Sequence, residues 1–146
     1  MVFIMNLEQI QEMWKRDSQI DSDLLCQEST KIPSLHMKYM ELYTTFALMK
    51  RENESKLKTL TRDKWLYYKG KAPAKLYAEM PFDYKLTSKD EVDMFIEADE
   101  EVQKTRLKVG YIEETLSYLD SVLRQINNRT YQIKNAIEWE KFKNGF

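Results

Sequence analysis

The residues of this sequence that are best suited to chemistry lie between Lys50 and Lys75, where basic side chains alternate with aromatic rings. Nine basic and three acidic residues give this segment a charge of plus six, whereas the whole 146-residue chain carries a charge of -1. A concentration of positive charge attracts phosphate backbones and releases their counterions. Aromatic faces add platforms on which unpaired bases stack. The segment therefore predicts a site for a single-stranded polyanion.

Eight residues of this segment are candidate contacts for a nucleic acid strand. They are Lys58, Arg62, Lys64, Trp65, Tyr67, Tyr68, Lys69 and Lys71. On a straight helix Arg62 and Lys64 point about 200 degrees apart, so they cannot grip one phosphate together. Basic runs are also common on solvated helix faces, and Tyr67 continues an apolar stripe, so at least one of the aromatics is expected in the core. Both interpretations stay open from the sequence.

The sequence offers little for catalysis or for metal binding. His36 is the single histidine and Cys26 the single cysteine. We find no glycine-rich phosphate loop, nucleophile motif or zinc-ligand spacing. A di-metal carboxylate bundle needs two Glu-x-x-His motifs, which one histidine cannot supply. The acidic residues at 97–101 are more typical of a solvated face than of a metal site. We therefore predict no enzyme activity, no metal and no cofactor.

The composition predicts one all-α domain, residues 1–146, as the scaffold for this segment. Charged residues make up 32% of the chain, and glycine and proline number only three each. No apolar run reaches the roughly 20 residues that span a bilayer. A single cysteine fits a reducing, cytoplasmic setting. The apolar start is too short for a signal peptide, and Met5 is an alternative first residue.

Short helices are expected before one long central helix. Asn6 and Gln9 form a capping box for the first helix, and residues 20–23 offer caps for the second. Ser34 is a suitable N-cap for a long helix that ends by Gly70, because glycine followed by Pro73 is a stop signal. These N-terminal helices occupy residues 6–69, and the basic segment 50–75 begins within them and ends in the connection that follows. Residues 70–87 form a connection whose aromatics suggest that it folds back over a helix.

A second long helix, residues 88–142, begins at a Ser88 capping box and is first acidic and then apolar. The acidic first turns either repel one another or pair with a basic neighbour. Two consecutive steps of three around Val109, beside Gly110, predict a bend or interruption. The apolar stripe contains Ile112, Leu116, Leu119, Leu123, Ile126, Ile133 and Ile137. So wide an apolar face needs more than one neighbour. We expect these seven residues to drive oligomerisation through residues 109–142, with burial within one monomer as the alternative.

Short motifs run in a characteristic order through nearly the whole chain from Asn6. They are Leu7, Lys15-Arg16-Asp17, Ile20-Asp21-Ser22, Arg62-x-Lys64 before Tyr67-Tyr68, Ala98-Asp99, Val102, Arg129, Ile133-Lys134 and Phe142-x-x-Gly145. In order and spacing the sequence resembles the UvsY-type recombination mediators of T-even-like bacteriophages. The connection 70–87 is the main region of divergence.

The resemblance implies a function that the residues alone do not give. Members of that family bind single-stranded DNA, displace or remodel the phage single-stranded-DNA-binding protein and load a RecA-like recombinase in the infected host's cytoplasm. They work as ring-shaped oligomers, heptameric in the family picture, that self-associate through the C-terminal helix. The family's basic pair before the double tyrosine is implicated in DNA binding, and it falls here on Arg62 and Lys64, in the reverse order. The alternative is a structural oligomerisation or adaptor protein without DNA binding.

Overall fold

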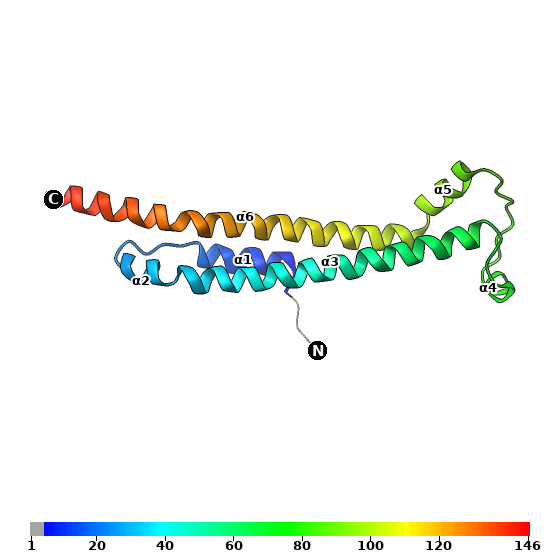
Figure 1. Ribbon diagram of the computed structural model, residues 1–146, viewed down its shortest axis with the longest axis horizontal. Helices are drawn as coiled ribbons and strands as arrows, with labels where there is room; N and C mark the ends of the chain where they lie inside the picture. Colours follow the sequence, from blue (N-terminus) through cyan, green and yellow to red (C-terminus); the bar gives the residue numbers. More distant parts are fainter. Residues whose placement is uncertain (1–4) are drawn as a thin grey trace. The chain divides into compact units, whose positions relative to one another are not determined.

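The computed structural model describes residues 5–146, and within them it contains helices and no strand (Figure 1). The helices are α1 Leu7–Asp17, α2 Leu25–Thr30, α3 Ile32–Tyr68, α4 Ala74–Glu79, α5 Lys89–Glu97 and α6 Glu100–Lys143. This confirms the prediction of an all-α chain with short N-terminal helices and long central and C-terminal ones. In residues 5–146 no helix is both long and apolar enough to cross a membrane. The suggestion that Met5 is the first residue concerns residues 1–4, which lie outside the described range.

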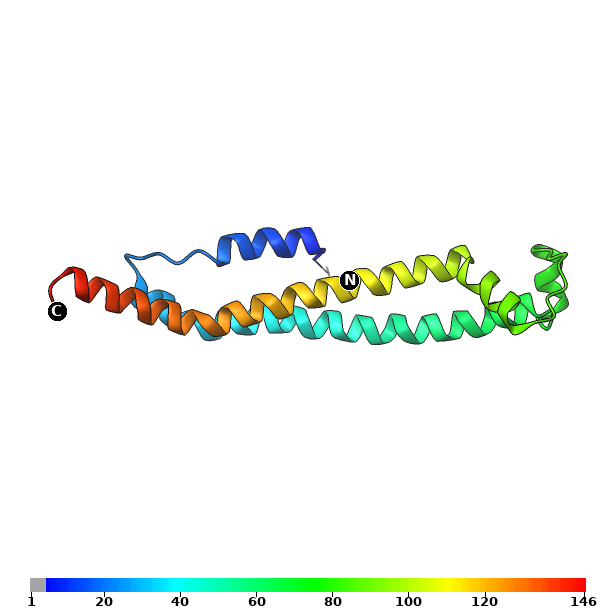
Figure 2. The same ribbon diagram turned by 90° about the horizontal axis from the view of Figure 1, so that it is seen from above.

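Contacts within the chain divide it into two units. The first unit comprises Met1–Phe46 with Glu114–Phe146, and the second is Ala47–Glu113. In the first unit, α1 packs beside the N-terminal part of α3, where the rings of Trp14 and Tyr39 meet edge to face with their centroids 5.4 Å apart. Helix α1 also runs alongside α6 (Figure 2). Its core residues include Ile10, Met13, Tyr39, Phe46, Leu119, Val122, Ile126 and Ile133. Burial of these apolar side chains contributes most of the free energy that holds the helices of the unit together.

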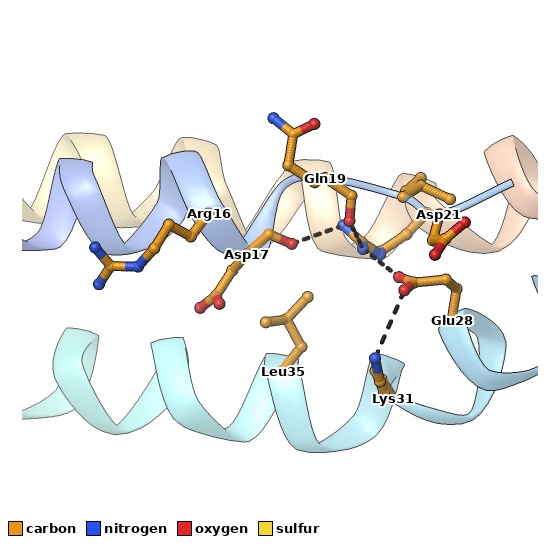
Figure 3. Close-up of a pocket in the computed structure, with 9 residues that line it drawn as sticks. Arg16, Asp17, Gln19, Asp21, Glu28, Lys31 and Leu35 are labelled. Atoms are coloured by element: carbon orange, nitrogen blue, oxygen red, sulfur yellow. Dashed lines mark hydrogen bonds and ion pairs between the residues drawn. The ribbon is translucent and has the colours of Figure 1, made fainter. Parts of the chain in front are cut away.

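A buried arginine joins α6 to the segment that links α1 and α2. Arg129 donates hydrogen bonds from Nη1 to the carbonyl oxygen of Asp17 (3.2 Å) and from Nη2 to that of Gln19 (2.9 Å). Its Nη2 also lies 2.9 Å from Oε2 of Glu28. Asp17, Gln19, Glu28 and Lys31 converge around this point, beside a pocket of about 470 Å³ (Figure 3). The guanidinium thus satisfies carbonyl groups at the C-terminal end of α1, where positive charge is favoured.

Local capping fixes three of the helix ends as the sequence predicts. Asn6 accepts from the backbone N–H of Gln9 (2.8 Å), and the Gln9 side chain accepts in return from the N–H of Asn6 (2.9 Å). Ser88 accepts from the N–H of Glu91 at the start of α5 (3.2 Å). After α3, Gly70 adopts φ +80°, a conformation that glycine tolerates without the strain of a Cβ. Its N–H bonds to the carbonyl of Tyr67, which closes the last turn.

One predicted helix start is wrong, and one predicted helix is divided in two. Helix α3 begins at Ile32 instead of after Ser34. Pro33 is tolerated in the first turn, because N–H groups there have no partner within the helix. The region 88–142 is two helices, since α5 ends at Glu97 and α6 begins at Glu100. The break arises because Asp99 caps α6, with Oδ1 accepting from the N–H groups of Glu101 (3.0 Å) and Val102 (3.2 Å).

Helix α6 does not break at Gly110, so the predicted interruption there is also wrong. Its buried face runs through Ile112, Thr115, Leu119, Val122, Ile126, Arg129 and Ile133. These positions alternate steps of three and four, the spacing of a coiled-coil seam. Two consecutive steps of three, from Val109 through Ile112 to Thr115, shift the register of the seam. The helix absorbs this shift without losing its backbone hydrogen bonding.

The connection 70–87 contains α4 and is held to the end of α3 by aromatic contacts. The rings involved are Tyr67, Tyr68, Tyr77, Phe82, Tyr84 and Phe95. Tyr67 stacks on Tyr77 with centroids 5.3 Å apart. The Tyr67 hydroxyl donates to the carbonyl of Met80 (2.8 Å), and that of Tyr77 donates to the carbonyl of Tyr67 (2.6 Å). The connection therefore folds back over a helix surface, as its aromatics predict.

Candidate nucleic-acid interface

One face of the C-terminal half of α3 carries three basic side chains and an indole. We call Lys58, Arg62, Trp65 and Lys69 the basic stripe. Their steps of four, three and four place them on the same side of the helix. Arg62 is 69% exposed, and its Nη2 lies 3.0 Å from Oδ1 of the adjacent Asp63. Lys58 is exposed, whereas Trp65 and Lys69 are half-buried.

The ion pairs of the segment separate its lysines into two groups. Lys50 pairs with Glu54 and Glu113, and Lys56 pairs with Glu52. Within residues 5–146, neither Lys58 nor Lys69 of the basic stripe has an acidic partner. Lys58 and Lys69 therefore leave unneutralised positive charge on the basic stripe. Among the described residues, Arg51, Lys71 and Lys75 of the same segment also have no acidic partner and lie outside the stripe.

Lys71 extends this surface beyond the end of α3. Its Nζ lies 5.2 Å from the centre of the Trp65 ring, a cation–π contact. Trp65 in turn packs against the buried cluster of Val92, Ile96 and Val102. The indole is thus held by the core while an ammonium group lies over its ring. An aromatic ring fixed beside free basic groups is suited to a negatively charged strand with unpaired bases.

Lys64 does not lie on the basic stripe. Its side chain is only 11% exposed, and its Nζ lies 3.3 Å from Oδ2 of Asp99 and 3.5 Å from Oε1 of Glu101. Arg62, two residues earlier, is exposed on the opposite side of α3. This agrees with the divergence of about 200 degrees that helical geometry predicts for the pair.

The two tyrosines after Trp65 serve mainly the interior of the second unit. Tyr67 is 7% exposed and has Tyr77 stacked on its ring, so it offers no free face to a base. The Tyr68 hydroxyl donates to Oδ2 of Asp99 at 2.6 Å, and its ring meets Phe82 and Phe95. The expectation that at least one aromatic belongs to the core is met by Tyr67. A direct stacking role for Tyr67 is inconsistent with this burial.

Asp99 gathers the polar groups at the corner between α5 and α6. Burial alone would raise the pKa of its carboxyl group. The hydrogen bonds from the Tyr68 hydroxyl, the Val102 N–H and the Lys64 ammonium outweigh burial and lower that pKa below its ordinary value. The pKa of Tyr68 is raised, first by burial and then by its hydrogen bond to the Asp99 carboxylate. The carboxylate and the phenol are therefore each held in one protonation state.

Tyr84 is an aromatic residue that the sequence argument did not select. Its side chain is 68% exposed, and its ring lies 5.7 Å from Phe82 and 5.8 Å from Phe95. The ring is therefore supported on one side and open on the other. The signal available in the sequence was its position next to Lys85, in a connection with few other exposed rings.

Comparison with known proteins decides the family. A family model described as "Recombination, repair and ssDNA binding protein UvsY" matches residues 13–146. The chain belongs to the UvsY family. The recombination protein uvsY of Enterobacteria phage T4 is 24% identical over 141 residues, covering 97% of this chain and 99% of that protein. Two crystal structures of the bacteriophage T4 recombination mediator protein UvsY match at 24% identity. Their TM-scores are 0.81 and 0.82, they cover 95% and 97% of this chain, and each match covers 99% of the T4 chain.

Membership of the UvsY family confirms the resemblance and the predicted class of function, which is recombination and repair through single-stranded DNA binding. The family is one of binding proteins, in agreement with the prediction of no enzyme activity. In residues 5–146, no group of three histidine, cysteine, aspartate or glutamate side chains is placed to hold a metal ion. Acidic residues on both sides of the corner between α5 and α6 instead pair with basic neighbours, since Glu97 at the end of α5 bonds to Arg106 and Glu101 at the start of α6 bonds to Lys64.

The seven residues predicted to drive oligomerisation fall into two rows on α6. Ile112, Leu119, Ile126 and Ile133, seven residues apart, are at most 3% exposed and belong to the buried seam. Leu116, Leu123 and Ile137 form a neighbouring row that is half-buried or exposed. The second of the two possibilities for the wide apolar face, burial within the monomer, therefore accounts for the first row. Further along, Trp139 and Phe142 stack on each other while 58% and 71% exposed.

Proposed function

We propose that this UvsY-family protein binds single-stranded DNA through the basic stripe and Lys71. The observation that carries the proposal is the alignment of Lys58, Arg62, Trp65 and Lys69 on one face, with two lysines that lack acidic partners in residues 5–146. Ammonium and guanidinium groups contact phosphates whatever the base, so the surface selects a strand and not a sequence. Binding by such a surface weakens as salt concentration rises.

Preference for single strands comes from the aromatic rings. Tyr84 presents an exposed ring in the adjoining connection. Trp65 is half-buried within the basic stripe, and a base that stacks on it displaces Lys71 from its ring. Stacking contributes about 1–3 kcal/mol per base and is available only where bases are unpaired. A labelled oligothymidylate should therefore bind more tightly than a duplex of the same length at equal salt. Equal affinities would show that charge alone is recognised.

The proposed role in the cell is that of a recombination mediator. The T4 relative is described as a recombination mediator protein. We infer that this protein likewise loads a RecA-like recombinase onto strands covered by the phage single-stranded-DNA-binding protein, in the cytoplasm of the infected host. Addition of the protein should restore the DNA-dependent ATPase activity of the recombinase on covered strands. Unchanged ATPase activity would reject the mediator role while leaving DNA binding intact.

We further propose that the protein works as a ring, a heptamer by family resemblance. The half-exposed row Leu116, Leu123 and Ile137, with Trp139 and Phe142, leaves apolar surface on α6 that a second copy would cover. A ring would repeat the basic stripe many times along one strand. Because linked weak contacts gain effective concentration, the assembly would bind far more tightly than one subunit.

The alternative is an oligomeric adaptor that has no DNA affinity. Such an adaptor would assemble through the same apolar row on α6, but the basic stripe would have no role in it. Binding of oligothymidylate at moderate salt separates the two, because the adaptor predicts no binding at protein concentrations that keep the ring assembled. The Lys58 and Lys69 side chains, without acidic partners in the described chain, favour the DNA-binding function.

A further inference from the structure

Arg62 and Lys64 form the basic pair that the resemblance assigns to DNA binding, yet their surroundings differ. Arg62 is 69% exposed and, among residues 5–146, pairs only with its neighbour Asp63. The Lys64 side chain is 11% exposed and faces Asp99, which is itself 7% exposed. A strand that passes along the basic stripe meets Arg62, whereas Lys64 lies on the side of α3 that faces α5 and α6.

The Lys64 ammonium group is an integral part of a polar joint. Asp99 receives hydrogen bonds on Oδ1 from the N–H groups of Glu101 and Val102, which start α6. On Oδ2 it receives the Tyr68 hydroxyl at 2.6 Å and lies 3.3 Å from Lys64 Nζ. The carboxylate thus ties the last two turns of α3 to the first turn of α6. We call Lys64, Tyr68 and Asp99 the corner joint.

The relative strengths of the contacts decide where Lys64 stays. If Lys64 turned towards a phosphate, Asp99 would keep three hydrogen-bond donors but lose its buried counterion. Breaking a buried pair is strongly unfavourable, because a charge is left uncompensated in a region of low dielectric constant. A phosphate contact at a hydrated surface gives much less, since it exchanges one set of counterions for another. The ammonium group therefore remains with the carboxylate when DNA is bound.

We propose that Lys64 is a positioning residue for the DNA site and that Arg62 alone of the pair contacts phosphate. Through Asp99, Lys64 fixes the last turns of α3, and with them the orientation of Trp65 and Lys69 in the basic stripe. The inference rests on the proposed function, because it assigns roles within the same DNA site. It separates two residues that the sequence presents as equivalent.

The experiment compares Lys64→Met and Arg62→Ala in the full-length protein, with oligothymidylate affinity measured across a series of salt concentrations. Arg62→Ala should lower the slope of log affinity against log salt by roughly 0.7 per engaged subunit, since one phosphate contact is lost. Lys64→Met should weaken binding by the same factor at every salt concentration and leave the slope at the wild-type value. A flattened slope in Lys64→Met, equal to that of Arg62→Ala, would overturn the proposal. So would an affinity that Lys64→Met leaves unchanged.

Asp99→Asn tests the joint from its other side, because the amide oxygen can still cap α6. Alone it should weaken binding in parallel with Lys64→Met. The double variant should be no weaker than the weaker single variant, since both changes break one joint. Additive losses would contradict coupling between the two residues.

Thermal unfolding keeps the inference testable apart from DNA binding. Lys64→Met and Asp99→Asn should each lower the unfolding midpoint by several degrees, and the double variant by less than the sum. Absence of oligothymidylate binding by the wild-type protein would reject the proposed function. The corner joint would then still be tested by thermal unfolding, because additive shifts of the unfolding midpoint would show that Lys64 and Asp99 are not coupled.

Discussion

Nη2 of Arg129 lies 2.9 Å from Oε2 of Glu28, and both side chains are less than a tenth exposed. The pair links α6 to α2 across 101 residues of sequence, and the same guanidinium holds the carbonyl groups that follow α1. Truncating one partner leaves the other charge buried without compensation, together with unsatisfied carbonyl oxygens.

Arg129→Met should therefore lower the free energy of unfolding by about 3–5 kcal/mol in urea titrations. Arg124→Met is the matched control, because Arg124 pairs with Asp120 on the same helix while 78% exposed. We expect that control to change stability by no more than about 0.5 kcal/mol. Similar losses in the two variants would show that burial of the Arg129 pair does not determine its importance.

The corner joint should give stability a defined pH dependence. The pKa of Asp99 is lowered below its ordinary 3.8, so its contribution is fully present above that value and is lost as pH falls through the lower, folded pKa. Asp99→Asn should remove this acid-dependent part of the unfolding free energy. A wild-type profile that the substitution leaves unchanged would contradict the assignment.

At alkaline pH the same joint keeps the Tyr68 phenol protonated. The pKa of Tyr68 is raised from 10.0 by burial and by the Asp99 carboxylate, so the folded protein binds this proton more tightly than the unfolded chain. Its contribution to stability is present below pH 10 and is lost as pH rises through the folded pKa. Phenolate absorbance should show Tyr68 ionising above its ordinary pKa of 10.0. Comparison with Tyr68→Phe identifies its share of the signal, and a normal titration near pH 10 would exclude the shift.

Replacement by alanine should change the free energy of unfolding in opposite directions at two glycines. Gly70 ends α3 with φ +80°, where an L side chain is strained, so Gly70→Ala should destabilise the protein by about 1–2 kcal/mol. Gly110 lies inside α6, and a Cβ added there meets nothing within 4 Å. Gly110→Ala should stabilise by about 0.5–1 kcal/mol through the higher helix propensity of alanine. Urea titration of the two variants measures both effects, and destabilisation by Gly110→Ala would imply a role for flexibility at that position.

Self-association should depend on the exposed Trp139 and Phe142 of α6 and not on its buried seam. Replacing Trp139 and Phe142 together with serine should reduce the mass measured by light scattering and leave the helical circular dichroism unchanged. Leu119→Ser is the contrasting variant, because Leu119 is fully buried and its loss should destabilise the subunit itself. An unchanged mass in the double serine variant would move the assembly surface elsewhere.

The sequence predicts features that depend on near neighbours more reliably than those that join distant segments. The Asn6–Gln9 and Ser88 caps and the Gly70 stop depend on residues within a few positions, and all three are present. The sequence does not predict the break at Asp99, because the acidic residues around it are typical of the first turns of a single helix. Its cap is local, but Lys64 and Tyr68 approach it from another helix.

The candidate DNA site shows the same difference between features set by near neighbours and features set by distant segments. Helical spacing predicted that Arg62 and Lys64 diverge, and the structure places them on opposite sides of α3. Spacing could not reveal which of the two faces the interior, because that depends on where α5 and α6 pack. Arg129 was noticed only through the family resemblance, since its partners are carbonyl groups and Glu28 far away in the chain.

The most direct test of the account is the salt dependence of oligothymidylate binding by a triple variant in which Lys58, Arg62 and Lys69 are replaced by alanine. Lys56→Ala is the control, because Lys56 lies on the same helix but pairs with Glu52. We expect the triple variant to lower the slope of log affinity against log salt by roughly 2 per engaged subunit, with the control unchanged. A triple variant that keeps the wild-type affinity and slope would place the DNA site outside the basic stripe.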